Sequence, residues 1–150
     1  MSILFEEIEF EIGQIEILLA NMKPLIDYCK VKTPDYIYCS AISSNIHAFY
    51  NGIEKIFIRI NKNIDDVAFS NSASHSELLD FMSKSTKARS AVITEETKNI
   101  LADYMRFRHF FRHSYTFNIS WEKLSPLILN IEKNWQIVKT EIQIFSKRCK

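Results

Sequence analysis

The scarcity of chain-breaking residues is the feature that most restricts how this chain can fold. Its 150 residues include only two glycines and three prolines. Tight hairpins and glycine-rich loops depend on these residues, so a chain with so few of them has little material for such turns. Hydrophobic residues make up 47% of the sequence and charged residues 25%, as in ordinary globular proteins. The sequence therefore predicts long helices in a single domain spanning residues 1–150.

Two N-terminal segments show the periodicity of amphipathic helices. Apolar residues recur every three or four positions, which places them on one helical face. In the first segment these are Phe5, Ile8, Ile12, Ile15, Leu19, Met22 and Ile26, and in the second Ile42, Ile46, Phe49, Ile53, Ile56 and Ile60. A second line, Ile3, Phe10 and Ile17, suggests that the first helix is buried on more than one side. Pro34 separates the segments, so we expect an antiparallel helix pair joined by a short turn.

The rest of the chain predicts one loop and three further helices. A composition rich in Asn, Asp and Ser indicates the loop, and capping residues ahead of acidic or apolar positions indicate helices. The loop covers residues 61–74, and the helices cover 74–85, 94–115 and 124–145. In the last helix, Pro126 either follows Ser125 at the first helical position or kinks an earlier helix. We expect an all-α fold, an up-down bundle of four to five helices.

Net charge, cysteines and apolar runs exclude several classes of function. The formal net charge is +1, so nucleic-acid binding requires a local basic site or one assembled by two subunits. Cys29, Cys39 and Cys149 are widely spaced and odd in number, which favours reduced thiols in a cytoplasm over disulfides or a zinc site. The acidic N-terminus is unlike a secretory leader, and no apolar run approaches the ~18 residues of a membrane span. We expect a cytoplasmic protein with no cofactor, metal ion or membrane contact.

A local basic site lies in residues 104–117, which read Tyr-Met-Arg-Phe-Arg-His-Phe-Phe-Arg-His-Ser-Tyr-Thr-Phe. Within eight positions this segment holds Arg106, Arg108, His109, Arg112 and His113. A helix C-terminus attracts cations through its macrodipole, by up to ~1 kcal/mol each. That effect does not call for two histidines. The interleaved phenylalanines also require part of the cluster to lie against a core or a partner.

These residue types suit the cleavage of an RNA phosphodiester. A neutral imidazole can take the proton of a ribose 2′-hydroxyl, and a guanidinium can bind the phosphate oxygens as negative charge builds. No Asp, Glu and His cluster with metal-ligand spacing accompanies the segment, so we expect a metal-independent reaction. At about 100° per residue, one helical face carries Arg106, His109 and His113, and the adjoining face carries Arg108, Arg112 and Tyr115.

Two stretches of the sequence resemble a known family. Residues 108–115, Arg-His-Phe-Phe-Arg-His-Ser-Tyr, match the Arg-X4-His-X-Tyr motif of HepT, the toxin half of a bacterial toxin–antitoxin pair in the HEPN superfamily. Residues 49–60, Phe-Tyr-Asn-Gly-Ile-Glu-Lys-Ile-Phe-Ile-Arg-Ile, look like the second helix of that family. Helix number and order agree as well, so the resemblance covers most of the chain.

The resemblance implies a HEPN-like bundle that dimerises and places two copies of the motif in one cleft, where RNA is cut without a metal ion. Arg108 would then hold the scissile phosphate and His113 would act as acid or base. Tyr115 would accept AMP from an MntA-like minimal nucleotidyltransferase, the antitoxin. A symmetric cleft doubles the local positive charge, which reconciles the net charge of +1 with an RNA substrate.

Three residues of the basic segment are possible auxiliaries. Arg106 shares a helical face with His113 better than Arg108 does, so it is the alternative catalytic arginine; the register of the tyrosine motif favours Arg108. His109 stands where many family members have Asn or Asp, and is a polar contact, a second proton carrier or a drifted position. Arg112 adds a further guanidinium on the face of Arg108.

Residues outside the segment are given smaller roles. Glu54 either pairs with an arginine of the fourth helix and orients it, or is an exposed helix residue. His47, one step from the apolar stripe, and His75, in a capping turn, are interpreted as structural or solvated residues rather than catalytic ones.

Two other functions compete with the endoribonuclease. One is a catalytically silent HEPN module that docks a nucleotidyltransferase partner. The other is a structural bundle whose basic helix end is a protein interface. The intact set of Arg108, His113 and Tyr115 favours the enzyme, because docking alone does not require it.

Overall fold

Helices account for most of the chain, and the part that the structure describes contains no strand. The computed structural model describes residues 2–69 and 74–149. The α-helices are α1 (Ser2–Val31), α2 (Tyr36–Ile60), α3 (Ser74–Met82), α4 (Glu95–His113), α5 (Trp121–Leu129) and α6 (Ile131–Cys149). Two short turns, the π-helical η1 (Asn61–Asp65) and the 3-10 η2 (Thr116–Asn118), follow α2 and α4. The predicted all-α bundle is confirmed.

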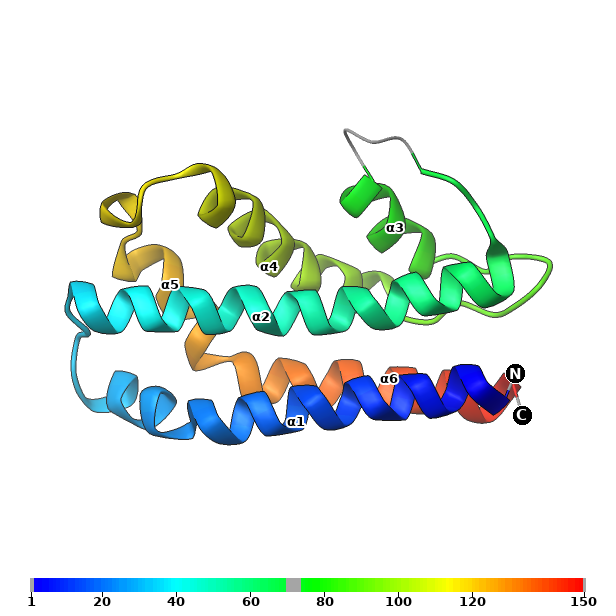
Figure 1. The fold of residues 1–150 in the computed structure, drawn as a ribbon, viewed down its shortest axis with the longest axis horizontal. Coiled ribbons are helices and arrows are strands. Elements are labelled where there is room, and N and C mark those ends of the chain that lie inside the picture. The colour runs from blue at the N-terminus through cyan, green and yellow to red at the C-terminus, as the bar shows by residue number, and fades with distance from the viewer. Residues whose placement is uncertain (1, 70–73, 150) are drawn as a thin grey trace.

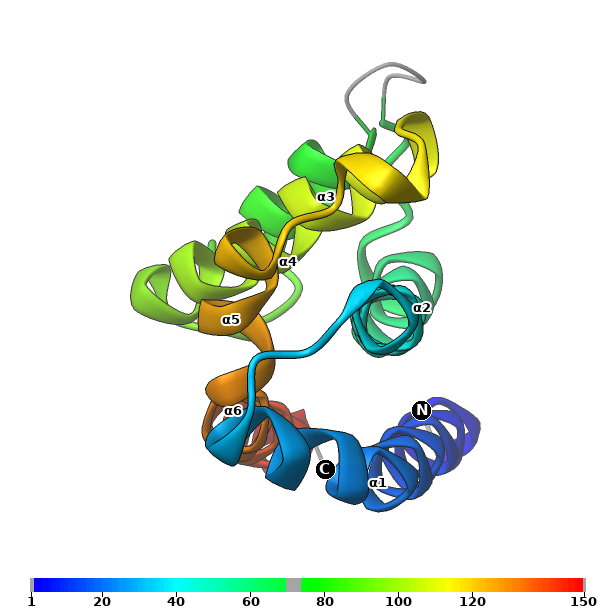
Figure 2. The same cartoon turned by 90° about the vertical axis from the view of Figure 1, so that its left-hand side faces the viewer.

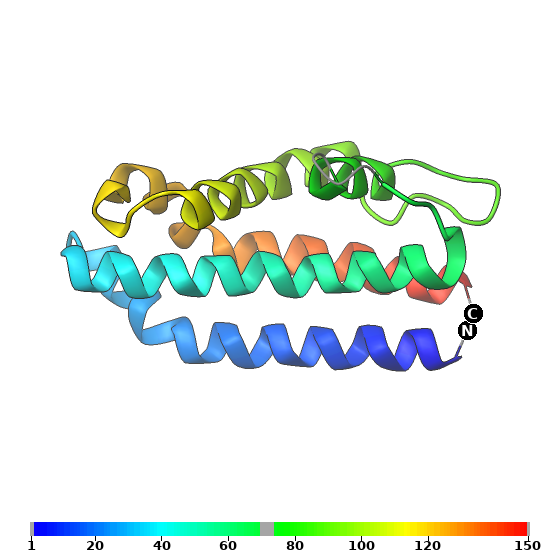
Figure 3. The same ribbon diagram turned by 45° about the horizontal axis from the view of Figure 1, so that its top comes forward.

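The long helices run along one axis of the molecule. α1 and α2 lie antiparallel, and α6 runs back beside α1 so that both ends of the chain lie at the same end of the bundle (Figure 1). Seen end-on, α1, α2 and α6 occupy three corners, and α4 with α5 closes the fourth side (Figure 2). α3 lies next to α4 on the outside of the bundle (Figure 3). This arrangement brings α2, α3 and α4 together although they are far apart in sequence.

The predicted antiparallel pair of α1 and α2 is confirmed, and a close contact holds it. The Asp35 side chain caps α2 by accepting a hydrogen bond from the Tyr38 amide at 3.0 Å. A Cβ atom at Gly52 would lie 2.8 Å from Cγ1 of Ile15, so the absence of a side chain lets the helices approach. Arg59 of α2 pairs with Glu7 and Glu11 of α1, each at 3.2 Å.

An aromatic cluster forms the centre of the core. Phe49, Tyr104 and Trp135 come from α2, α4 and α6 and are buried together, with ring centroids 5.3 Å (Phe49–Tyr104) and 6.2 Å (Phe49–Trp135) apart. The Tyr104 hydroxyl donates to the carbonyl of Leu127 at 2.7 Å and accepts from the Asn134 amide at 3.0 Å. Burial raises the pKa of Tyr104 to about 12. These contacts fix the rotation of α4 about its own axis.

The second apolar line of α1 is not buried in the single chain. Ile3, Phe10 and Ile17 are 69%, 60% and 56% exposed, so the suggestion that α1 is covered on more than one side is wrong for one copy. The residues lie seven apart, which places them on one stripe of the helix. The stripe is therefore an apolar part of the surface of one copy.

Two predicted boundaries also differ. The loop expected over 61–74 begins with η1, which continues α2 until Asp66 turns the chain at φ 51°; residues 70–73 lie outside the described residues. Pro126 lies inside α5 rather than at its start, and the chain turns at Asn130, whose side-chain amide donates to the Pro126 carbonyl at 2.8 Å. The predicted last helix is therefore two helices, and residues 2–69 and 74–149 hold six α-helices, one more than the upper end of the expected four to five.

Arg89 closes the end of the bundle between α3 and α4. Its Nε donates to Asp65 at 2.9 Å, and its terminal nitrogens donate to the carbonyls of Lys84, Ser90 and Phe81 at 2.8, 3.1 and 3.3 Å. Both charged side chains are almost fully buried, with exposed fractions of 0% for Arg89 and 2% for Asp65. A guanidinium with this many partners is structural, and it ties the end of α2 to the connection before α4.

Candidate functional site

α4 carries the basic segment, and its two ends determine where that segment lies. Thr94 caps the helix by accepting a hydrogen bond from the Thr97 amide at 3.2 Å, as predicted, and two glutamates follow in the first turn. The helix ends at His113, so the last turn holds Arg112 and His113. Buried Tyr104 and Phe107 face the core, which turns Arg108 toward α2 and α3.

Arg108 is held by side chains from two other helices. Its Nε donates to Oδ1 of Asn51 on α2 at 2.6 Å. Its NH1 lies 3.5 Å from Nε2 of His75 on α3, at the outer limit of a hydrogen bond. The residue is half-buried. Its NH2 has no recorded partner among residues 2–69 and 74–149, so part of the guanidinium fork is open for an anion.

Glu54 reaches Arg108 through a histidine and not directly. Its carboxylate oxygens lie 2.8 and 2.9 Å from Nδ1 of His75, whose other ring nitrogen faces Arg108. The predicted direct pairing with an arginine is therefore wrong, and so is the alternative of an exposed glutamate, because Glu54 is only 5% exposed. His75 was expected to be structural or solvated, and the structure favours the first of these: its side chain is partly exposed, yet it bridges a buried carboxylate and a guanidinium.

His47 lies one turn before Asn51 on the same side of α2. Its ring packs against Phe111 with centroids 5.3 Å apart, and its Nδ1 is buried with no hydrogen-bond partner among the described residues. Burial lowers the pKa of His47, and the positive charges of Arg108 and Arg112 lower it further. His47 therefore stays neutral near pH 7 and senses the charge of the cluster.

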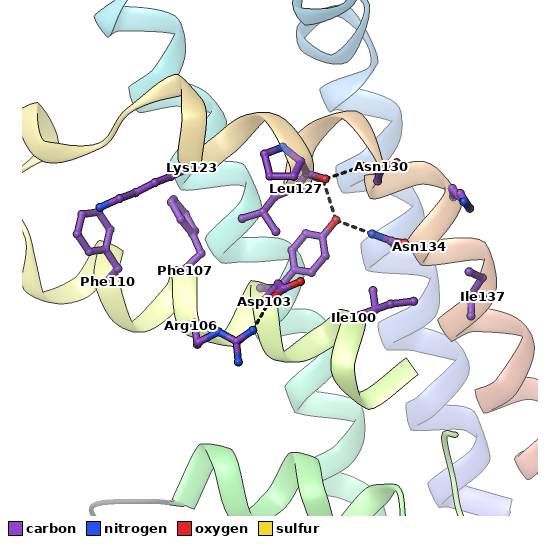
Figure 4. A pocket seen from close by; sticks show the side chains of 13 residues that line it. Ile100, Asp103, Arg106, Phe107, Phe110, Lys123, Leu127, Asn130, Asn134 and Ile137 are labelled. Atoms are coloured by element: carbon purple, nitrogen blue, oxygen red, sulfur yellow. Dashed lines mark hydrogen bonds and ion pairs between the residues drawn. The ribbon is translucent and has the colours of Figure 1, made fainter. Parts of the chain in front are cut away.

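Arg106 lies on another side of α4. It borders a groove of about 760 Å³ between α4 and the α5–α6 segment, with Phe107 and Phe110 on the same helix and Lys123 reaching across from α5 (Figure 4). Its guanidinium already pairs with Asp103, one turn back. Lys123 lies over the Phe110 ring, 3.6 Å from its centroid. The two candidate arginines therefore face different surroundings, and Arg106 has no link to α2 or α3 in the described residues.

The remaining residues of the segment are exposed at the end of α4. The rings of His109 and His113 lie 4.6 Å apart, one turn from each other. No recorded contact joins His113 to Arg108 within the described residues. Tyr115 is 74% exposed and stacks on Phe117, which is 71% exposed, with centroids 5.3 Å apart and planes 6° from parallel. Next to this stack, the Tyr36 hydroxyl and Thr116 Oγ1 lie 2.5 Å apart, which ties η2 to the start of α2.

A second groove connects Arg108 to the exposed stripe of α1. It has a volume of about 560 Å³ and lies over α1 and α2. Arg108, Asn51 and Glu54 line one part of it, and Phe10 and Ile58 line another. Ile58 is also an exposed apolar residue. The polar cluster and the uncovered apolar surface are therefore continuous.

No group of three or more His, Cys, Asp or Glu side chains suited to a metal ion occurs among residues 2–69 and 74–149. In the same residues, no helix is both long and apolar enough to cross a membrane.

The chain belongs to the HepT-like protein family, whose sequence profile matches residues 41–149, from within α2 to the end of α6. The resemblance seen in residues 49–60 and 108–115 is thereby confirmed at the level of the family. Membership carries a toxin–antitoxin context and a general association with nucleases. Comparison with curated proteins and with solved structures gives no match.

Sequence reasoning missed two residues of this cluster, Asn51 and His75. Asn51 lies three residues before Glu54 and so shares its helical face, a signal that was present in the 49–60 stretch. No comparable signal exists for His75. It lies outside every motif, and only the packing of α3 against α2 and α4 brings it to Glu54 and Arg108.

Proposed function

We propose that this protein is a metal-independent endoribonuclease toxin that acts in the cytoplasm as a homodimer. In this proposal Arg108 holds the scissile phosphate, His113 transfers protons, and Tyr115 accepts AMP from an MntA-like minimal nucleotidyltransferase. One observation carries it: the Arg108 guanidinium is anchored by Asn51 and faces His75, yet keeps open donors at the edge of a groove. An arginine oriented in advance stabilises charge that develops on a phosphate.

The chemistry needs only proton transfer and charge stabilisation. A neutral imidazole removes the proton of a ribose 2′-hydroxyl, and the oxygen attacks the adjacent phosphorus. The bond to the 5′-oxygen breaks, and that oxygen receives a proton from an imidazolium. The products are a 2′,3′-cyclic phosphate and a 5′-hydroxyl. Because Arg108 supplies the positive charge at the phosphate, a chelator should leave the reaction unaffected.

The exposed aromatic pair supports a single-stranded RNA substrate. Tyr115 and Phe117 are exposed, stack on each other, and follow the exposed Arg112 and His113 in the chain. Unpaired bases stack on exposed aromatic rings, by about 1–3 kcal/mol per base, while neighbouring cations follow the backbone. A base-paired duplex offers no free base face for such a contact.

The exposed stripe of α1 supports a dimer. Covering Ile3, Phe10 and Ile17 with a second copy removes apolar surface from water, and the groove beneath this stripe ends at Arg108. We expect Phe10→Glu to convert a dimer into a monomer in sedimentation experiments. Ala20→Glu adds the same charge at an exposed position of α1 that borders α6, and serves as the matched control.

Tyr115 has the exposure that a modification site requires, since its side chain lies open to solvent. An AMP group on its hydroxyl would add bulk and negative charge next to Arg112 and His113. RNA would then be excluded by occupancy and by repulsion of its phosphates.

A silent docking module is the second candidate, and one observation favours it. Within a single chain His113 contacts His109 and is not joined to Arg108 in the described residues. A subunit that only presents Tyr115 to a nucleotidyltransferase has no need to bring these two side chains together.

The test compares wild-type protein with Arg108→Ala, His113→Ala and Arg106→Ala on total RNA in excess EDTA. Circular dichroism first establishes that all four fold, and intact-mass measurement establishes that none carries AMP. Arg148→Ala, an exposed arginine on α6, is the matched control. We expect wild type, Arg106→Ala and Arg148→Ala to cut RNA, and the other two to lose the activity.

The opposite outcomes are equally clear. If Arg106→Ala loses RNA cleavage and Arg108→Ala keeps it, the roles of the two arginines are exchanged. Intact RNA with unmodified wild-type dimer would leave the docking module as the better function.

A further inference from the structure

Three side chains from three helices form a chain in which acceptors and donors alternate: Glu54 on α2, His75 on α3 and Arg108 on α4. We propose that His75 is a positioning residue for RNA cleavage, which, backed by Glu54, holds the Arg108 guanidinium in the orientation that receives the phosphate. The inference rests on the proposed function, and it assigns a role to a histidine outside the Arg-X4-His-X-Tyr segment.

The buried carboxylate determines which nitrogen of His75 carries the proton. Glu54 is nearly inaccessible to solvent, and both of its oxygens lie within 2.9 Å of Nδ1. An ionised carboxylate only accepts hydrogen bonds, so Nδ1 is the protonated nitrogen. In the neutral ring Nε2 then carries a lone pair, and it faces NH1 of Arg108, which can only donate.

The arginine is consequently restrained at two of its three nitrogens. Asn51 accepts from Nε at 2.6 Å, and His75 faces NH1 at 3.5 Å. A free arginine side chain samples many rotamers, and each must be given up when a phosphate binds. Restraining the guanidinium beforehand removes much of that cost, and Arg108 lines the groove over α1 and α2.

The same contact is not needed to hold α3 in place. Leu78, Leu79 and Met82 of α3 are buried in the core. Asp80 pairs with Lys98 of α4 at 3.2 Å, a second link between the same two helices and further from the site. His75 is partly exposed, and its ring contributes little to the core. A purely structural role does not explain why one ring nitrogen of His75 faces Glu54 and the other faces Arg108.

Charged side chains from α2 and α4 balance one another around His75. Glu54 contributes one buried negative charge from α2, and Arg108 and Arg112 contribute positive charges from α4. His47, also on α2, faces the two arginines, and its pKa is lowered first by burial and then by their positive charges. The carboxylate thus offsets one guanidinium, and the other remains to attract the phosphates of RNA.

The experiment compares His75→Ala, His75→Gln and Lys98→Met in the full-length dimer. Lys98→Met is the matched control, because it breaks the other α3–α4 link. Three quantities are measured: kcat and KM on a single-stranded RNA, affinity for the same oligonucleotide with 2′-deoxy sugars, and solvent exchange of the Arg108 Nε–H by NMR. The double variant His75→Ala/Arg108→Ala completes a cycle.

We expect His75→Ala to lower kcat/KM by about 10- to 100-fold and to speed Nε–H exchange. His75→Gln, whose amide can donate toward Glu54 and accept from Arg108, should recover part of both. Lys98→Met should match wild type in all three measurements. In the Arg108→Ala background, His75→Ala should cause no further loss, because the residue acts through Arg108.

The inference is overturned if His75→Ala cleaves like wild type, if Lys98→Met causes the same loss, or if the losses of the two single variants multiply in the double variant. Failure of the proposed function is distinguishable from this. If wild type cuts no RNA, Nε–H exchange and oligonucleotide affinity still test the inference. The positioning role is supported if both quantities change in His75→Ala and in no other variant with Arg108 intact. It is overturned if both quantities stay unchanged in His75→Ala.

Discussion

Arg89 and Arg108 show two ways in which the same side chain is used in one molecule. Arg89 is fully buried, pairs with Asp65, and directs its remaining donors to three backbone carbonyls. Arg108 is half-buried, has Asn51 and His75 beside it, lines a groove, and has no partner for NH2 among the residues that the structure describes. The closed cluster around Arg89 has no room for a ligand, whereas the cluster around Arg108 is oriented but incomplete.

The difference teaches how to separate a structural arginine from a functional one. Both residues contact side chains from distant segments. What distinguishes them is the number of donors left unfilled, because a guanidinium that binds substrate must keep part of its fork free. Stability should therefore depend on Arg89, and RNA chemistry on Arg108.

The largest expected effect is on stability at the closed cluster. Replacing Arg89 with Met leaves Asp65 charged and buried without its partner, and three carbonyls lose their donor. We expect the free energy of unfolding to fall by about 3–5 kcal/mol. Urea denaturation measures it. Lys84→Met in the same connection breaks only an exposed pair and should change stability by about 0.5 kcal/mol or less. Equal losses in the two variants would contradict the contrast.

Next in size is the effect on cleavage at the open cluster. Arg108→Ala should lower kcat by about 100- to 1000-fold, the range seen when one preorganised donor to a transition state is removed. Its unfolding free energy should change by less than about 1 kcal/mol, because the side chain is only half-buried. A variant that loses stability and activity together would show that Arg108 resembles Arg89 after all.

A smaller effect is expected beneath the open groove, where α1 and α2 approach most closely. Gly52→Ala places a Cβ atom against buried Ile15, and we expect a loss of about 1–3 kcal/mol from the forced shift. Gly13→Ala is the control, since nothing lies within 4 Å of its added Cβ atom. That variant should gain about 0.5–1 kcal/mol from helix propensity. Thermal denaturation of both variants separates the effect of the contact with Ile15 from the effect of helix propensity.

The smallest effect concerns the pH dependence contributed by His47. The pKa of His47 in the folded chain lies below the ordinary value of about 6.5. Just below that pH, the unfolded chain therefore binds a proton at His47 more readily than the folded chain does. His47 therefore makes the free energy of unfolding decrease as pH falls below about 6.5. His47→Phe should reduce this slope. Conversely, inorganic phosphate bound at Arg108 and Arg112 should raise the pKa of His47 in an NMR titration, and an unchanged pKa would place the anion elsewhere.

Much of the fold was predictable because helical periodicity is local. The stripes at residues 5–26 and 42–60, the Thr94 cap and the turn at Pro34 each depend on residues a few positions apart. The errors lie where local signals compete. Pro126 was expected to start or kink a helix, yet the chain turns at Asn130, and η1 continues α2 into a segment whose composition indicated a loop.

The features of the candidate site also divide into those that follow from local sequence and those that follow from packing. The register of Arg108, His113 and Tyr115 is a property of one continuous segment, and the family assignment follows from it and from residues 49–60. Which of two arginines two positions apart meets α2 and α3 is a matter of helix rotation, and buried Tyr104 and Phe107 set that rotation.

By itself the sequence determined an all-helical protein of the HepT-like family with its basic residues at the end of one helix, because each of these properties resides in neighbouring residues. Only the tertiary structure decided that Glu54 meets His75, that Arg89 is closed while Arg108 stays open, and that the Ile3–Phe10–Ile17 stripe is uncovered. The physical reason is that burial and hydrogen-bond partners depend on how α2, α3 and α4 pack, which no single stretch of sequence specifies.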